Sequence, residues 1–524
     1  MPRMLLVGGL VVALVVGGGL GWTALADGRL DLLGASGGEV WGHAWVQWWH
    51  GVELPAWPSG PGERVPGDRQ WPVIDPLPTA IAAVLSRLIG AVAAYDLVLL
   101  VGVFGAFVGG AWLAHQEDGD PWVGGLALAL APSFLGTLAS GLTEDLALGL
   151  AAVGLGLVGR PDLRRAVLGG ACLGVLASCG LVLAWATGVV AVGLGLGAMA
   201  WRAERRKVLV GLAVGAVTAG ILAIPPALLQ GARLGGDGHR SGGFVPRFEP
   251  LWRLNPWKGV DLASFWVPGR VDPGDALVRM HPGYLGLSLV VLGLLAGRSR
   301  WWLVLLGAVL VAPGTHLSWM GQPLGMEGPA VALGWLPFGE LINHHGRLLM
   351  LGAVALSVLA ARGARQVTRR WGRPWGRGAV LAVVVVDLAL LGPVPTPLPT
   401  ADARPLGVYT LPDFAALPEG AVLQLPAAGP GIHFQRPLYD QRIHQRPLLL
   451  DPNRPGLPPA YSRTDSGRFL ASLVAPDSAP APSAVEWPAG VALLVVSEPY
   501  VDRVADAFGP PSLRAEDSAV WTSP

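Results

Sequence analysis

The chain has 524 residues, of which 52% are hydrophobic and only 14% are charged, and its mean hydropathy is +0.50. This composition is typical of a membrane protein. The formal net charge of +1 provides no basic excess that would attract a nucleic acid, so no nucleic-acid partner is expected.

Apolar windows follow one another along most of the chain. They lie at residues 4–25, 94–114, 122–139, 143–159, 166–182, 184–200, 208–228, 282–297, 301–315, 347–361 and 378–395. Windows of roughly 15 to 22 apolar residues approach the length that an α-helix needs to cross a bilayer. The sequence therefore predicts a mainly α fold, a polytopic transmembrane bundle of about 11 helices. The first window ends in Ala-Leu-Ala, like a signal-peptidase site, but it is longer than a cleaved segment, so we expect a retained helix.

The short connections between these windows carry a charge pattern that orients the bundle. Residues 160–165, 201–207, 298–300 and 362–377 are basic, whereas 115–121 is acidic. Since basic loops stay on the cytoplasmic side, a cytoplasmic N-terminus satisfies all of these connections except the acidic one. The sequence thus predicts a multi-pass protein of the cell (plasma or inner) membrane with an extracytoplasmic C-terminal part.

In this orientation the external segments are long. Residues 1–395 are predicted to form the transmembrane domain, with external loops at 26–93, 229–281 and 316–346. Residues 396–524 are predicted to form a soluble extracytoplasmic α/β domain. Its expected elements are strands at AVLQLP (421–426) and VALLVVS (491–497) and a helix at VDRVADAF (501–508).

Residues 37–50, GGEVWGHAWVQWWH, lie near the start of the first external loop. At about 100° per residue, a helix here has tryptophans on one side and mainly polar or ionisable residues on the other. The tryptophans are Trp41, Trp45, Trp48 and Trp49, and the other side carries Glu39, His43, Gln47 and His50. Because Trp is enriched at membrane interfaces, we expect the indoles at headgroup level and the ionisable groups away from lipid.

Glu39 has three interpretations. Ser36-Gly37-Gly38-Glu39 fits a capping box, in which Glu39 bonds back to the Ser36 amide. The carboxylate can instead act as an acid or base on a substrate. Glu39, His43 and His50 are also metal-ligand types, although i,i+4 spacing is common for any residues sharing a helix face. The cofactor therefore stays unknown: a divalent metal is an alternative, but no metal site is predicted.

A second acidic cluster, Thr143-Glu144-Asp145, lies at the expected outer end of the fourth window. Adjacent carboxylates at the mouth of an apolar segment are costly unless they are hydrated or paired. One interpretation is that Thr143 is a helix N-cap and that the helix dipole favours Glu144 and Asp145. Alternatively, the two carboxylates join Glu39 in an acid/base arrangement on the outer face.

Two further features concern charges near or inside the membrane. In LPFGELINHHGRLLM (336–350), the side chains of Asn343, His344, His345 and Arg347 offer hydrogen-bond donors where a lipid phosphate would lie. Simple interfacial anchoring by Arg347 is the alternative. Asp387 stands alone within the last apolar window, and the sequence does not identify its partner or role.

Several of these segments together carry a family resemblance. They are GEVWGHAWVQWW and its loop, SGLTED (140–145), GYLGLSLVVLGLL (283–295) and LPFGELINHHGRLLM, followed in the tail by AVLQLP, YDQRIHQRPLL (439–449) and VALLVVSEPYVDRVADAF. In this order they resemble the GT-C superfamily of integral-membrane glycosyltransferases. The details are similar to its bacterial polytopic branch, which includes lipoteichoic-acid-glycosylating membrane proteins.

The resemblance implies a function and a set of site residues. Such enzymes transfer a sugar from a polyprenyl-phosphate donor to a cell-envelope acceptor, here a glycan, a lipid or a protein. Glu39 becomes the candidate base, although many members have Asp at this position, and Glu144 and Asp145 loosely match a second acidic motif. His43, His344, His345 and Arg347 are the candidate donor-binding residues; Arg347 is assigned to the donor phosphate from its charge and depth.

Two other classes of function remain open. One is a transporter or flippase of a lipid-linked precursor, which requires facing polar groups at mid-membrane, where this chain offers mainly Asp387. The other is a catalytically inactive GT-C-like scaffold. The sequence contains no nucleotide-binding loop and no HExxH motif, so a nucleotide-driven reaction is not expected. It does not specify the sugar, the acceptor or the oligomeric state.

Overall fold

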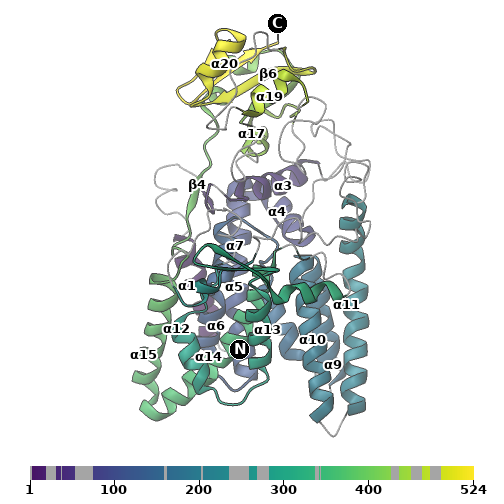
Figure 1. Ribbon diagram of the computed structural model, residues 1–524, viewed down its shortest axis with the longest axis vertical. Helices are drawn as coiled ribbons and strands as arrows, with labels where there is room; N and C mark the ends of the chain where they lie inside the picture. Colours follow the sequence, from purple (N-terminus) through teal and green to yellow (C-terminus); the bar gives the residue numbers. More distant parts are fainter. Residues whose placement is uncertain are drawn as a thin grey trace.

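The computed structural model describes residues 3–18, 31–36, 38–53, 75–158, 162–201, 205–234, 259–267, 282–336, 342, 344–426, 436–449, 463–472 and 486–523. It is elongated, with a bundle of helices below and a smaller unit of strands and helices above, where the C-terminus lies (Figure 1). We call the elements from β4 to β8 the C-terminal unit, and the end of the bundle that carries it the upper end.

The apolar windows fold as helices. In chain order these are α1 (Arg3–Val16), α5 (Ala91–Gln116), α6 (Pro121–Ala129), α7 (Pro132–Ala139), α8 (Leu148–Leu157), α9 (Leu163–Ala177), α10 (Leu181–Trp201), α11 (Arg205–Leu234), α12 (Leu287–Leu295), α13 (Trp301–Val311), α14 (Leu349–Trp371) and α15 (Arg373–Val385). Among the described residues, four helical stretches are long and apolar enough to cross a membrane: Ala91–Gln116, Pro121–Ala139, Arg205–Pro225 and His345–Trp371. Each predicted window overlaps a helix, but the number of membrane passes stays a prediction.

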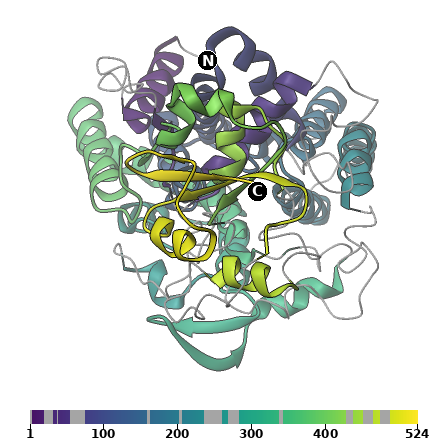
Figure 2. The same ribbon diagram turned by 90° about the horizontal axis from the view of Figure 1, so that it is seen from above.

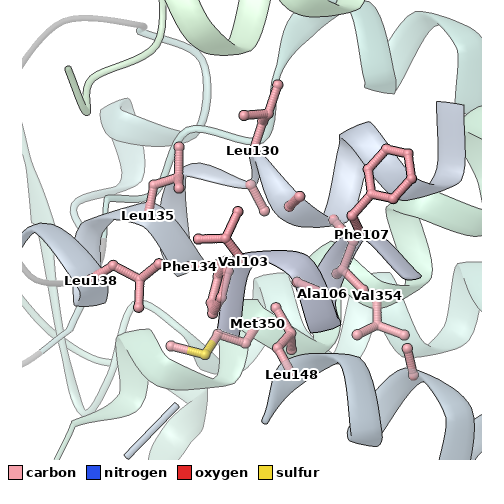
Figure 3. Packing of buried hydrophobic residues seen from close by; sticks show 14 of the residues in the cluster. Val103, Ala106, Phe107, Leu130, Phe134, Leu135, Leu138, Leu148, Met350 and Val354 are labelled. Atoms are coloured by element: carbon pink, nitrogen blue, oxygen red, sulfur yellow. The ribbon is translucent and has the colours of Figure 1, made fainter. Parts of the chain in front are cut away.

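The bundle is centred on α5, which packs against α1, α6 and α8. Phe107, Phe134 and Met350 fill the space between α5, α7 and α14 and are fully buried (Figure 3). A Cβ added at Gly109 or Gly149 would collide with the backbone of the facing helix. Glycines at these positions therefore let α5 and α8 approach closely, as small residues do in membrane bundles.

The first external loop contains two helices. α3 (Val40–Glu53) lies where the two-faced helix was predicted, and α4 (Pro76–Ile89) follows it. Figure 1 shows both between the bundle and the C-terminal unit. α4 was not predicted, because its 14 residues are shorter than a membrane span and begin with two closely spaced prolines.

The C-terminal unit contains a four-stranded mixed sheet. Its strands are β5 (Ala421–Leu425), β6 (Val491–Ser497), β7 (Leu513–Arg514) and β8 (Ser518–Thr522), in the order β5-β6-β8-β7. β5 and β6 are parallel and the other pairs antiparallel. The helices are α16 (Gly407–Thr410), α17 (Arg436–His444), α19 (Asp465–Ser472) and α20 (Val501–Phe508). The two predicted strands and the predicted helix 501–508 are confirmed, whereas the domain boundary at 396 stays a prediction.

Short elements connect these parts. β1 (Asp31–Leu33) pairs antiparallel with β4 (Thr400–Asp402), which ties the first external loop to the start of the C-terminal unit. The hairpin β2 (His316–Trp319) and β3 (Gln322–Glu327) lies between the 3-10 helices η4 (Leu262–Phe265) and η6 (Pro329–Trp335) in sequence. A further 3-10 helix, η8 (His345–Leu348), leads into α14. Most of the predicted loop 229–281, and residues 19–25 of the first window, lie outside the described residues.

The acidic connection that broke the charge pattern is neutralised by arginines of neighbouring connections. The pairs are Glu117 with Arg300 at 2.7 Å, Asp118 with Arg365 at 3.3 Å and Asp120 with Arg377 at 3.0 Å. Each of these three carboxylates of the acidic connection therefore has an arginine partner from a basic connection.

Asp387 has partners that its sequence did not reveal. Tyr284 donates its hydroxyl to Asp387 Oδ1 at 2.5 Å, and the Ser288 amide donates to Oδ2 at 2.7 Å. Asp387 thus accepts a hydrogen bond from a backbone amide in the first turn of α12. It acts as a capping acid does, although it belongs to a different segment. These contacts support a structural role.

Candidate active site

The loop that precedes α8 packs on the start of α3. The Glu39 amide donates to Ser140 O at 2.7 Å, and a Cβ at Gly38 would collide with Ser140. Gly141 has φ +81°, and a Cβ there would meet the Val40 backbone. Glycines are therefore required on both sides of this contact, which joins Gly38 and Glu39 to SGLTED (140–145).

His43 is held by a chain of hydrogen bonds. Its Nδ1 lies 2.8 Å from Thr143 Oγ1, and Thr143 donates its hydroxyl to Asp75 Oδ2 at 2.6 Å. On the other side of the ring, Nε2 lies 3.4 Å from Glu39 Oε2. The His43 side chain is 18% exposed and the Glu39 side chain is 26% exposed. Of these two hydrogen-bonded residues, Glu39 is therefore the more accessible to a substrate.

The surroundings of His43 favour its protonated form. Burial alone would lower the pKa of His43, but the hydrogen bond to Glu39 and the charges of Asp75, Glu39 and Glu144 raise it to about 8. Burial, together with the charge of Glu144, raises the pKa of Asp75 above its ordinary range, even though His43 and the Thr143 hydroxyl favour its ionised form. Both shifts favour the protonated forms of His43 and Asp75.

A second group lies beside the first. Arg347 donates from Nη1 to Glu144 Oε2, and its Nε lies 4.0 Å from Asp145 Oδ2. Burial alone would raise the pKa of Glu144, but the charges of Arg347 and His43 and the hydrogen bond from Arg347 lower it. Burial raises the pKa of Asp145 to about 6 despite the nearby Arg347. Glu144 is therefore the ionised partner of the guanidinium.

The two capping interpretations are wrong. α3 begins at Val40, so Glu39 stands directly before the helix and not at the third helical position that a capping box from Ser36 requires. α8 begins at Leu148 with Ala147 at its N-cap, so Thr143 does not cap it. In both cases the polar side chain is directed into the cluster around His43.

The sequence matches no protein-family model and no curated protein. Its fold, however, is similar to that of the arabinofuranosyltransferase AftD from mycobacteria, with a TM-score of 0.55 and 16% sequence identity. The match covers 100% of this chain and 41% of AftD, so the chain spans less than half the length of that protein.

The chain has the fold of the GT-C glycosyltransferases. The oligosaccharyltransferase of Archaeoglobus fulgidus gives a TM-score of 0.47 at 11% identity, covering 96% of this chain and 71% of that one. ArnT from Cupriavidus metallidurans gives 0.43 at 15% identity, covering 99% and 97% of the two chains.

Within this GT-C fold, the predicted donor-binding histidines are not equivalent. His43 lies in the cluster. His345 is buried, and its Nδ1 lies against the turn at Gly314, since a Cβ there would be 3.5 Å away. His344 precedes η8 and is half-buried. Asn343 lies outside the described residues. Of the hydrogen-bond donors predicted in 343–347, Arg347 is thus the one that the structure places beside the carboxylates of Glu144 and Asp145.

The tryptophan face of α3 contacts the C-terminal unit. Trp41 and Trp45 are buried; the Arg436 guanidinium lies 4.2 Å from the Trp41 ring, and the Trp45 indole donates to Gln441 Oε1 at 2.9 Å. Trp49 is also buried there, and Trp48 is half-buried. The predicted placement of these indoles at headgroup level is therefore wrong, because the C-terminal unit covers them.

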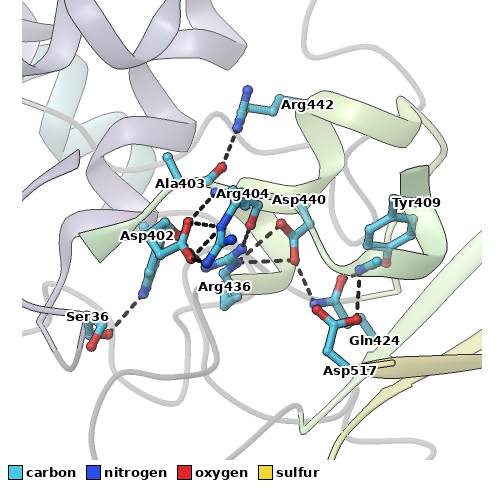
Figure 4. A network of polar contacts seen from close by, with 12 residues as sticks. Ser36, Asp402, Ala403, Arg404, Tyr409, Gln424, Arg436, Asp440, Arg442 and Asp517 are labelled. Atoms are coloured by element: carbon cyan, nitrogen blue, oxygen red, sulfur yellow. Dashed lines mark hydrogen bonds and ion pairs between the residues drawn. The ribbon is translucent and has the colours of Figure 1, made fainter. Parts of the chain in front are cut away.

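A polar network fixes this contact in the GT-C fold. Arg436 pairs with Asp440 at 3.2 Å, and Gln424 joins Asp440 to the Tyr409 hydroxyl (Figure 4). Asp440 is fully buried, so its pairing with Arg436 offsets the cost of burying its charge. Together with the indole packing, this network positions α3, which carries His43 and directly follows Glu39.

Asp75 is the site residue that the sequence analysis missed. It occupies the N-cap of α4 and is followed by Pro76, a sequence typical of an ordinary helix start. Its side chain makes no capping hydrogen bond and instead accepts from Thr143. Among the described residues, no group of three or more His, Cys, Asp or Glu side chains is arranged to hold a metal ion.

Proposed function

We propose that this chain is a membrane glycosyltransferase that moves a sugar from a polyprenyl-phosphate donor to a cell-envelope acceptor on the extracytoplasmic face. The observation that carries the proposal is the convergence of Glu39, His43, Asp75, Glu144, Asp145 and Arg347 at the upper end of an apolar bundle with the GT-C fold. A site at the membrane boundary suits a donor whose lipid stays in the bilayer and whose sugar reaches water.

In the proposed reaction, an acceptor hydroxyl attacks the anomeric carbon of the donor sugar. The new carbon–oxygen bond forms as the bond to the phosphate oxygen breaks, and its electron pair leaves with the phosphate. Glu39 takes the proton of the acceptor hydroxyl, because it is the most exposed carboxylate on His43. Protonated His43, oriented by Thr143, holds the Glu39 carboxylate in place.

Arg347 is the proposed partner of the donor phosphate. Its Nη1 already bonds Glu144, whose side chain is 32% exposed and can turn toward solvent. A phosphate at this position would take over the guanidinium contact from Glu144 as a charge-assisted hydrogen bond. Asp145 is 1% exposed, so it stays beside Arg347 and fixes its orientation.

The test is turnover of a panel of polyprenyl-phosphate sugars by the purified full chain. Glu39→Gln keeps the size of the side chain and removes the base, so we expect it to lower kcat by roughly 10²- to 10⁴-fold. Glu419→Gln, at an exposed position of the C-terminal unit, is the matched control and should retain wild-type turnover. Equal turnover by Glu39→Gln and wild type would remove Glu39 from the mechanism.

A further inference from the structure

An apolar surface is exposed at the upper end of the bundle, beside α13. It consists of the hairpin β2–β3 with residues of η4 and η6, and we call it the hairpin patch. Its large exposed side chains are Trp266, Val267, Trp319, Met320, Leu324, Met326, Trp335 and Leu336. Between residues 316 and 336 the sequence contains a single carboxylate, Glu327, and no Lys or Arg. An exposed apolar patch of this kind marks an interaction site.

The hairpin is fixed to the rest of the fold. Asp261 is buried and accepts hydrogen bonds from the Met320 amide at 3.1 Å, from the Gly321 amide at 2.9 Å and from the Ala263 amide at 2.8 Å. At the other end, the Gly328 amide donates to Thr315 O at 2.8 Å. Hydrogen bonds at both the turn and the base of the hairpin therefore hold the apolar side chains in an ordered structure.

The position of the hairpin points to lipid. It follows α13, whose Leu303, Leu306 and Leu310 are also large apolar side chains left exposed. Figure 2 shows the hairpin at the rim of the bundle, reaching beyond the helices. The 11 residues of α13 rise only about 16 Å, against about 30 Å of hydrocarbon core, so the hairpin follows a helix that is shorter than a full membrane span.

We propose that the hairpin patch is a membrane-surface anchor that enters the boundary between headgroups and acyl chains on the side of the C-terminal unit. Trp suits this boundary because its ring is apolar and its N–H is polar. The free edges of a two-stranded hairpin need water or headgroup partners, which excludes the hydrocarbon core.

Cross-linking of the wild-type chain tests the anchor directly. In nanodiscs with a phospholipid that carries a photoactivatable group near its headgroup, we expect lipid adducts on peptides from 316–336. Peptides from 501–514, which include α20, are the internal control and should carry none. Adducts on α13 without adducts on 316–336, or cross-links between two protein copies through 316–336, would overturn the proposal.

A second measurement places individual side chains. An environment-sensitive dye on Met320→Cys and on Met326→Cys should be quenched by spin-labelled lipid and protected from aqueous iodide. The same dye on Asp502→Cys, where the native side chain is 84% exposed on α20, should show the reverse. The native thiols, Cys172 and Cys179, are half-buried and buried, and the wild type gives their background. Iodide quenching at both hairpin positions would contradict a lipid partner.

Discussion

At the scale of single residues, the site holds more carboxylates than cations. Glu39, Asp75, Glu144 and Asp145 face His43 and Arg347 within one connected cluster. Such an excess is tolerated when some of the acids stay protonated, and the raised pKa values of Asp75 and Asp145 show this response. Burial thus lowers the net negative charge of the cluster by favouring the protonated forms of these two acids.

His43 should make stability depend on pH. Its folded pKa of about 8 lies above the ordinary 6.5, so its contribution is fully present below pH 6.5 and is lost as the pH rises through about 8. The shift corresponds to about 2 kcal/mol. We expect the melting temperature in detergent to fall between pH 6 and 9 in the wild type, and to fall less in His43→Gln.

The control for this titration is His316→Gln, which removes an exposed histidine outside the cluster. It should keep the wild-type pH dependence. If the melting temperatures of His43→Gln and wild type decrease by the same amount between pH 6 and 9, the protonated state of His43 does not stabilise the fold.

Sequence reasoning reached part of this cluster. The i,i+4 spacing of Glu39 and His43 and the adjacent carboxylates of Glu144 and Asp145 made these residues candidates, and the family resemblance then assigned their roles. Asp75 was missed because an Asp before Pro at a helix start has an ordinary local explanation. Only the three-dimensional contact with Thr143 shows that its carboxylate is directed elsewhere.

At the scale of elements, α3 shows why periodicity predicts a face but not its partner. The sequence pattern correctly predicted a helix here, although Glu39 lies directly before it, and Trp45 and Trp49 gather against one partner. Membrane headgroups and a protein interior both accept indoles, so the pattern could not distinguish them. The contacts of Trp41 with Arg436 and of Trp45 with Gln441 show that the partner of this face is the C-terminal unit.

Trp45→Ala should loosen this contact. The side chain is 1% exposed and belongs to the same buried cluster as Val408 and Leu448 of the C-terminal unit, so its removal leaves a cavity and removes the hydrogen bond that Gln441 Oε1 accepts. We expect a loss of about 3 to 5 kcal/mol, visible as a lower melting temperature and faster proteolysis of the C-terminal unit. Trp375→Ala, which removes an indole that is 87% exposed, is the matched control. Equal effects of the two variants would mean that α3 is not held through Trp45.

At the scale of the whole molecule, hydropathy located the helices well and their lengths poorly. Apolar windows mark helices because lipid and protein interior both favour apolar side chains, yet α12 and α13 have only 9 and 11 residues. The break between α6 and α7 falls at Leu130 and Ala131, just before Pro132. Helix ends of this kind depend on tertiary contacts that the sequence pattern does not contain.

The orientation of the chain is the remaining whole-molecule prediction. If the basic connections lie inside, Asp118 at the lower end of the bundle faces the cytoplasm and Asp502 in the C-terminal unit faces outward. Both native side chains are highly exposed, at 90% and 84%, so cysteines at these positions are accessible to a reagent. In intact cells a membrane-impermeant maleimide should label Asp502→Cys and should label Asp118→Cys only after permeabilisation. Labelling of Asp118→Cys alone in intact cells would invert the topology, and would place the cluster around His43 on the cytoplasmic side.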